Sequence, residues 1–145
     1  MLKRYGERQR IPPQPWETSD RHYPFARIYT DLLHSDAFCD MSSRQQILYV
    51  NIAAQRYGAK YRPCKDFPNT SEFRDDENPA FYFNFALASE ICRLYSKNGR
   101  KEFYADMRSL KEHGFITEVA NGRANHTKSI YRYSAKWRTW KPPRV

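Results

Sequence analysis

The segment from Phe81 to Trp140 constrains the fold most, because its apolar residues change from a helical spacing to an alternating, strand-like spacing within one short stretch. The spacing predicts two helices followed by a hairpin: helices near 85–96 and 100–113, and strands near 115–119 and 129–134. Phe81, Tyr82 and Phe83 predict a short strand before the first helix, which Asn84 can cap. An α+β fold follows from this order of elements.

The predicted helix 100–113 has one apolar face, since Phe103, Met107 and Leu110 recur at helical spacing. Its charged residues are divided between two flanks. Glu102 and Asp106 lie on the acidic flank, and the basic flank carries Lys101, Tyr104, Arg108 and Lys111. A helix that contacts a phosphate backbone benefits from turning its carboxylates away, although an ordinary solvated helix face has the same composition.

A helix stop and a basic loop follow this helix. Gly114 is placed to end it in a left-handed turn, after which Phe115 and Ile116 open a strand. The polar stretch 120–128 contains Asn-Gly and leads into a second strand. Four residues of this loop and its shoulder are candidates for contacts with phosphates or a minor groove: Arg123, His126, Lys128 and Arg132. An ordinary surface hairpin is the alternative interpretation.

The positive charge is concentrated in the same half of the chain. Of the net charge of +9, residues 1–22 contribute +2, residues 23–84 contribute −1 and residues 85–145 contribute +8. A localised excess of this kind favours binding of a polyanion such as nucleic acid, and it carries no information about sequence specificity.

The first half of the chain predicts a supporting helix. Ser42 or Ser43 can cap a helix near 43–57 that ends at Gly58. We expect its core face to consist of Ile47, Leu48, Ile52 and Ala53. Upstream, Phe25 and Ile28 predict a strand, and a short helix follows with Leu32, Leu33 and Phe38. In the later helix 85–96, the predicted core face consists of Leu87, Ile91 and Leu94.

Three segments fall outside this pattern. Residues 1–22 are basic and rich in proline, which predicts an extended arm that lies along DNA, docks a protein partner or is merely solvated. Residues 59–80 predict an insertion loop, which is a mobile segment or a contact for a protein partner. Residues 141–145 form a tail. The acidic residues 72–77 within the loop lack a second acidic cluster that would complete a two-metal nuclease site.

Several classes of protein are disfavoured by the sequence. It contains no apolar run of about 20 residues that would span a bilayer, and its start lacks the apolar core of a signal peptide. Cys39, Cys64 and Cys92 show no CxxC pair, and the four histidines are widely spaced. We therefore expect a soluble cytoplasmic protein with reduced cysteines, no cofactor and no metal, which is not an enzyme. No heptad tract predicts a coiled-coil dimer.

Three stretches carry a resemblance to a known family: FYFNFALASE, YSKNGRKEFYADMRSLKEHGFI and SIYRYSAKW. They resemble the winged helix-turn-helix modules of phage and plasmid proteins, including the amino-terminal domains of plasmid replication initiators. The stretch ARIYTDLLHSDAFCDMSSRQQILYVNI is similar to the opening strand and helix of those modules. The resemblance covers most of residues 23–140.

The resemblance implies a winged-helix domain over residues 23–140 that binds double-stranded DNA without catalysis. Helix 100–113 would recognise the DNA and the wing of residues 121–128 would contact its backbone. In this interpretation the phosphates are held by Lys97, Arg100 and Lys111, base edges are approached by Lys101, Tyr104 and Arg108, and the wing contacts come from Arg123, His126 and Lys128.

The insertion 59–80 and the arm depart from the family pattern. We expect no appended catalytic or oligomerisation domain, which a complete replication initiator would normally have. The expected role is that of a small transcription regulator or DNA replication accessory protein of a mobile element. A protein-interaction module built on the same scaffold is the alternative. A metal-dependent nuclease is the third interpretation.

Overall fold

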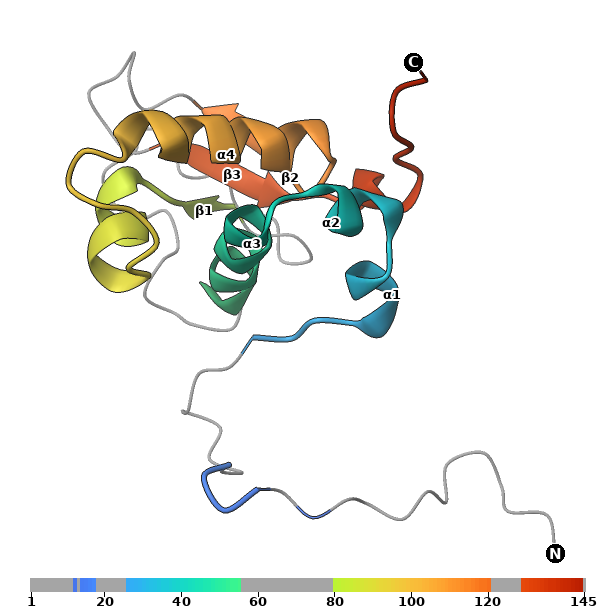
Figure 1. Ribbon diagram of the computed structural model, residues 1–145, viewed down its shortest axis with the longest axis horizontal. Coiled ribbons are helices and arrows are strands. Elements are labelled where there is room, and N and C mark those ends of the chain that lie inside the picture. Colours follow the sequence, from blue (N-terminus) through green and yellow to red (C-terminus); the bar gives the residue numbers. More distant parts are fainter. Residues whose placement is uncertain (1–11, 13, 18–25, 56–79, 121–128, 145) are drawn as a thin grey trace, which may run out of the picture.

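The computed structural model of the chain describes residues 12, 14–17, 26–55, 80–120 and 129–144 (Figure 1). The predictions made for most of the arm 1–22, for nearly all of the insertion 59–80 and for the hairpin loop 121–128 lie outside the described residues. The helices and strands are, in chain order, α1 (Thr30–Leu33), α2 (Asp36–Asp40), α3 (Ser43–Gln55), β1 (Phe81–Tyr82), the π-helical turn η3 (Leu87–Ile91), α4 (Arg100–Glu112), β2 (Ile116–Ala120), β3 (Ile130–Tyr133) and the 3₁₀ turn η4 (Lys136–Arg138). The predicted α+β class is confirmed.

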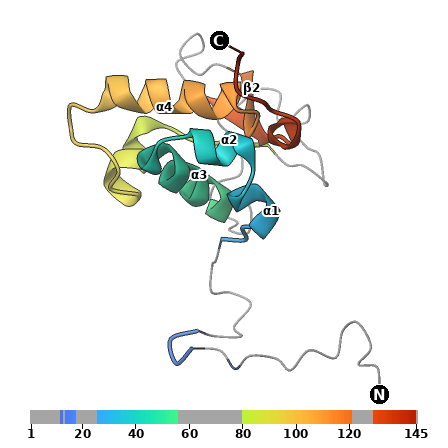
Figure 2. The same ribbon diagram turned by 45° about the vertical axis from the view of Figure 1, so that its right-hand side comes forward.

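The three strands form one small antiparallel sheet in the order β1-β3-β2. Phe81 of β1 lies opposite Tyr131 of β3, and Ile116 of β2 lies opposite Tyr133. The β2–β3 ladder is regular as far as Glu118, after which the register shifts by one residue before Ala120. In Figures 1 and 2, α4 lies across the top of the molecule with α3 beneath it.

Ser42, one of the two serines predicted to cap α3, does so, and it forms a capping box with Gln45. The backbone N–H of Gln45 donates to Ser42 Oγ at 3.3 Å, and the N–H of Ser42 donates to Gln45 Oε1 at 3.1 Å. The helix is described as far as Gln55, so the predicted stop at Gly58 lies outside the described residues.

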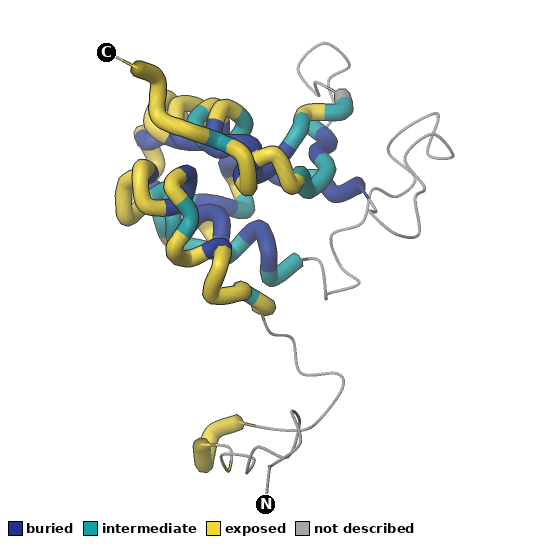
Figure 3. The backbone as a smooth tube through the Cα atoms, turned by 90° about the vertical axis from the view of Figure 1, so that its right-hand side faces the viewer, coloured by how far each residue is buried: buried dark blue, intermediate teal, exposed yellow. Residues whose placement is uncertain are grey.

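Two aromatic groups fill the core along α4. Near its start, Phe103 packs between Phe83, Phe85 and Tyr95, with ring centroids 5.6–6.0 Å apart. Beyond its end, Phe115 contacts Phe38, Tyr49 and Trp137. The predicted apolar face of this helix is confirmed, since Phe103, Met107 and Leu110 are all buried. Figure 3 shows the buried positions in the middle of the described domain, where helices and strands meet.

Gly114 ends α4 in the predicted left-handed turn. Its φ is +84°, the N–H of Phe115 donates to the carbonyl of Leu110 at 3.0 Å, and the N–H of Gly114 donates to that of Lys111 at 3.1 Å. The carbonyl of Gly114 accepts from the N–H of Trp137 at 3.1 Å. A Cβ at residue 114 would lie 2.6 Å from that nitrogen, so only glycine fits beneath η4.

The predicted regular helix 85–96 is wrong in its second half. Asn84 caps the helix as predicted, because its Oδ1 accepts a hydrogen bond from the N–H of Leu87. The helix begins at Phe85 and changes to the π-helical turn η3 at Leu87. Arg93 adopts a left-handed conformation with φ of 57°, and this ends the helix. Because a π turn holds more residues than an α turn, the expected spacing no longer follows one face. Ile91 is therefore 63% exposed and Leu87 and Leu94 are only half-buried, while Ala88 and Tyr95 are buried.

Three smaller predictions are also wrong. Residues 26–29 form no strand, and Ile28 packs against the core as irregular backbone, without pairing to the sheet. The following short helix is split into α1 and α2, because Ser35 caps α2 by accepting from the N–H of Phe38. In α3, Ile47 is 49% exposed and Tyr49 takes its place in the core, since the buried sector is centred on Leu48 and Ile52. No helix in the described segments is long and apolar enough to cross a bilayer.

Candidate functional site

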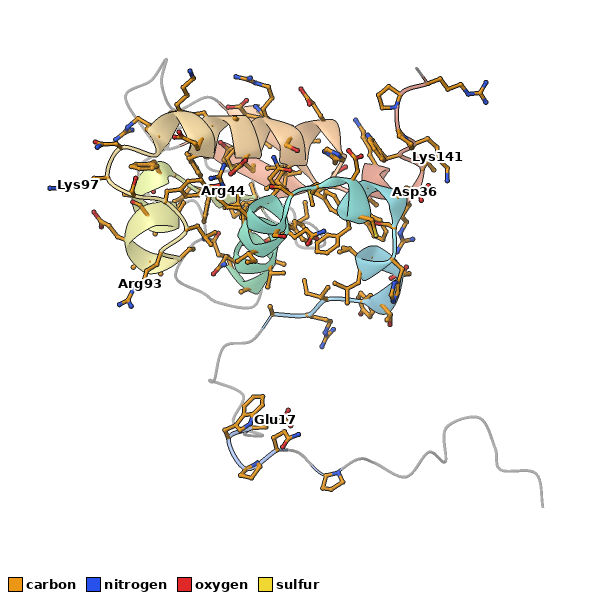
Figure 4. The ribbon with its side chains drawn as sticks, viewed as in Figure 1. Glu17, Asp36, Arg44, Arg93, Lys97 and Lys141 are labelled. Carbon is orange, nitrogen blue, oxygen red and sulfur yellow. The ribbon has the colours of Figure 1, made fainter. Side chains whose placement is uncertain are left out.

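The exposed side of α4 carries most of the residues predicted for the site. Lys101, Tyr104 and Arg108 are exposed, and the phenol-bearing side chain of Tyr104 is exposed to 52%. Arg100 is exposed at the first position of the helix, where its guanidinium lies 4.8 Å from the centroid of the Phe85 ring. Lys97 projects from the turn before the helix (Figure 4). We call these five residues the basic face.

Within the described residues, most charges of the basic face have no ion-pair partner. Over the segments that the structure describes, Lys97, Lys101 and Arg108 have no ion-pair partner. The exposed carboxylates of α4 belong to Glu102 and to Glu112, and Glu112 follows Arg108 by four residues and therefore lies on the same flank, without an ion pair in the described segments. Glu102 lies on the flank of the helix that faces Arg44, away from Tyr104. The basic face therefore presents unpaired cations around an exposed aromatic ring.

Asp106 does not belong to an exposed acidic flank, which corrects the sequence-based prediction. Its residue surface is only 3% exposed. Arg44 Nε donates to Asp106 Oδ2 at 2.6 Å, the Tyr95 hydroxyl donates to the same oxygen at 2.5 Å, and Gln45 Nε2 donates to Oδ1 at 3.1 Å. The helical position of Asp106, three residues after Phe103 and four before Leu110, is what places it at the edge of the core.

These bonds determine the protonation of the buried groups. Burial alone would raise the pKa of Asp106, but the hydrogen bonds from Arg44, Tyr95 and Gln45 outweigh burial and hold it below its ordinary value. Burial, and then the bond to Asp106, raises the pKa of Tyr95. Asp106 is thus a carboxylate that faces inward and is neutralised by Arg44, whose side chain lies between α3 and α4 (Figure 4).

The same set of hydrogen bonds continues from Asp106 to the end of α4. Ser109 Oγ donates to Gln45 Oε1 at 3.1 Å, and the Nδ1 atom of His113 lies 2.7 Å from the carbonyl oxygen of Ser109. His113 Nε2 lies 2.8 Å from Asp40 Oδ2, and the ring packs on Trp140 with centroids 4.7 Å apart. We call this line from Tyr95 to Asp40 the α4 network. It fixes the orientation of α4 against α3 and α2.

The remaining predicted site residues are placed differently. Lys111 is half-buried and forms an ion pair with Glu118 of β2, with Nζ and Oε2 3.1 Å apart. Arg132 is half-buried on β3, opposite Thr117. Arg123, His126 and Lys128 lie outside the described residues. The structure therefore groups Lys97, Arg100, Lys101, Tyr104 and Arg108 on one helix and its preceding turn, with Lys111 paired at the edge.

Sequence reasoning missed two residues that shape this site. Arg44 is 62 positions away from Asp106, and no local spacing links them. Glu118 was predicted only as part of a strand, and its ion pair with Lys111 was not foreseen. Both contacts arise from tertiary packing, which periodicity does not report.

The described residues show no arrangement suited to metal chemistry. They contain no group of three or more His, Cys, Asp or Glu side chains able to hold an ion. Cys39 and Cys92 are free thiols, and burial raises the pKa of Cys92, which disfavours its nucleophilic form. What the described site offers chemically is a cationic, partly aromatic helix face.

No family model matches the chain, and no curated protein or solved structure is significantly similar to it.

Proposed function

We propose that the protein binds double-stranded DNA without catalysis, through the basic face of α4. The observation that carries the proposal is the distribution of charge on this helix. The inner carboxylate of Asp106 is buried and paired with Arg44, whereas Lys97, Lys101 and Arg108 are exposed and unpaired within the described segments. Glu112 lies beside Arg108, but Glu102 and Asp106 are both turned away from this face, and solubility alone does not require that arrangement.

The fold is compatible with this role. A helix pair, a sheet in the order β1-β3-β2 and a hairpin after α4 fit the winged helix-turn-helix that the sequence resembles, with α4 as the recognition helix. An α-helix with its side chains is about 10–12 Å across and fits a major groove about 12 Å wide. The predicted role is that of a regulator or replication accessory protein of a mobile element.

The basic face divides into two kinds of contact under this proposal. Lys97 and Arg100, at the turn and the first residue of α4, are placed to hold phosphates. Lys101, Tyr104 and Arg108 lie further along the exposed side and approach base edges, where an arginine can bond guanine with two hydrogen bonds.

The test is binding of a fluorescently labelled random-sequence duplex at several salt concentrations. Four cations of the basic face that each replace one counterion predict a log-log slope of about −3.6, and wing residues would make it steeper. A flat salt response, or no binding at low salt, would refute the proposal.

A matched pair of variants locates the surface. Arg108→Gln removes one charge from the basic face, whereas Lys141→Gln removes one charge that is paired with Asp36 at the other end of the molecule from Lys97 (Figure 4). Arg108→Gln should weaken duplex binding about threefold or more at moderate salt and reduce the slope by about one unit. Lys141→Gln should bind like the wild type. Equal effects would mean that net charge, and not α4, governs binding.

The protein-interaction alternative has its own observation. Tyr29 and Ile91 are large apolar side chains that are more than 60% exposed. If the duplex does not bind, a protein-docking role for these side chains is the next hypothesis. The nuclease interpretation is tested by adding Mg²⁺ to the same duplex and looking for cleavage products.

A further inference from the structure

The ion pair between Lys111 and Glu118 lies at the edge of the basic face. Lys111 comes three residues after Arg108 and seven after Tyr104, so it lies on the same flank of α4 as both. Its Nζ is 3.1 Å from Glu118 Oε2, and the two side chains are 35% and 28% exposed. The pair is therefore accessible to a ligand that approaches the basic face.

The backbone of β2 holds the carboxylate in this place. Glu118 is the last residue of the regular β2–β3 ladder, directly opposite Tyr131, and the register shift follows immediately. A bulge of this kind redirects side chains at the end of a strand pair. Burial, followed by the nearby charge of Glu118, raises the pKa of Tyr131 to about 12, which agrees with a carboxylate held close to that phenol.

A carboxylate on a surface meant for phosphates opposes binding in two ways. It repels the incoming phosphate, and it occupies the lysine that the phosphate would use. Among the cations of α4 and its preceding turn, Lys97, Lys101 and Arg108 have no ion pair in the described part of the chain, and only Lys111 is held in this way.

We propose that Glu118 is a built-in competitor of the DNA phosphate for Lys111 and so limits the affinity of the basic face for DNA. This inference rests on the proposed DNA-binding function. On binding, Lys111 exchanges the Glu118 carboxylate for a phosphate oxygen. Glu118 is then left without its lysine partner beside the bound phosphate, and the loss of that ion pair is what lowers the affinity.

The central test is the variant Glu118→Gln, which keeps the shape of the side chain and removes its charge. In the wild type the phosphate contact of Lys111 is made at the loss of its ion pair with Glu118, whereas in Glu118→Gln nothing is displaced. With a salt slope of about 0.9 per phosphate contact, the full contact at 0.1 M salt strengthens binding by a factor of up to about 8 relative to 1 M. Glu118→Gln should therefore bind a random duplex about threefold to eightfold more tightly at 0.1 M salt, with a slope steeper by about one unit.

Two further variants separate competition from simple charge. Asp36→Asn removes the carboxylate from another exposed ion pair, the one between Asp36 and Lys141. It changes the net charge by the same amount as Glu118→Gln, but at a position outside α4 and β2. It should leave duplex affinity unchanged. In a Lys111→Gln background, Glu118→Gln should gain no more than about twofold, because only the screened repulsion is then relieved.

Each outcome has a defined meaning. Three outcomes would overturn the inference and leave the proposed function intact. Glu118→Gln could bind the duplex with wild-type affinity, Asp36→Asn could gain as much affinity as Glu118→Gln, or Glu118→Gln could gain its full affinity in the Lys111→Gln background. A wild-type protein that binds no duplex would overturn both. The urea unfolding midpoint of Glu118→Gln should stay near that of the wild type, because exposed ion pairs contribute little to stability. A lowered midpoint with unchanged affinity would show a purely structural role.

Discussion

Replacement of Gly114 by alanine tests how tightly the end of α4 is joined to the carboxyl-terminal segment. A residue with a Cβ in the left-handed region costs about 1–2 kcal/mol by itself. In addition, the new Cβ would lie 2.6 Å from Trp137 N and 2.7 Å from the carbonyl carbon of Lys136. Both neighbours are backbone atoms, so no side-chain rotation relieves the clash.

The remaining cost follows from moving η4. A retreat of about 0.8 Å restores an ordinary contact but lengthens the 3.1 Å bond from Trp137 N–H to the Gly114 carbonyl beyond hydrogen-bond range, a loss of about 1 kcal/mol. It also disturbs the stacked rings of Phe115 and Trp137, whose centroids lie 6.0 Å apart, and overpacking of this kind costs about 1–3 kcal/mol. We expect Gly114→Ala to lower the free energy of unfolding by about 3–6 kcal/mol.

Urea unfolding followed by circular dichroism and tryptophan fluorescence measures this loss. Gly114→Asn is the matched comparison, because asparagine tolerates the left-handed region yet carries the same Cβ. It should still lose about 2–4 kcal/mol. If Gly114→Asn is within about 1 kcal/mol of the wild type, the cost arises from backbone preference alone and the argument from the clash is refuted.

Two other predictions concern the elements that hold α4. Asp106→Asn should destabilise the protein by about 2 kcal/mol at neutral pH, less than for a fully buried pair because Arg44 is 45% exposed. Since the pKa of Asp106 is depressed in the folded state, the carboxylate stabilises the fold above about pH 4 and its contribution is lost as the pH falls further. Urea titrations from pH 7 to pH 2 should show the difference between the two proteins shrinking below pH 4, and a constant difference would contradict this. Arg93→Gly should stabilise the protein by about 0.5–1 kcal/mol by relieving the left-handed strain at φ 57°, whereas Arg93→Ala should not; equal thermal midpoints for the two variants would show that the backbone is not strained.

Local patterns predicted the elements whose structure depends on neighbouring residues. The apolar face of α4, its glycine stop, the Asn84 cap and the capping box at Ser42 all involve partners within five residues. The strands of the sheet were also predicted to within a residue or two. Because the interacting residues are close in the sequence, hydrophobic periodicity and capping residues are enough to predict these elements.

The errors arose where tertiary contacts decide. Ile91 is exposed because the π-helical turn η3 changes the direction in which its side chain points. The spacing of the apolar residues does not predict a turn wider than that of an α-helix. Asp106 was interpreted as solvent-exposed because its partner Arg44 comes from a distant helix. For the site, the exposure of Lys101, Tyr104 and Arg108 agrees with their helical positions, but the pairing of Lys111 with Glu118 required the packing of β2 against α4.

The α4 network has a consequence for the speed of complex formation. It ties the middle of α4 to α3 at Asp106 and the end of α4 to α2 at His113, so this half of the helix is held before any ligand arrives. A surface that is already ordered loses little conformational entropy when it is occupied. Encounters with a polyanion would then be limited by diffusion and by the attraction of the positive field, and not by a slow rearrangement of the helix.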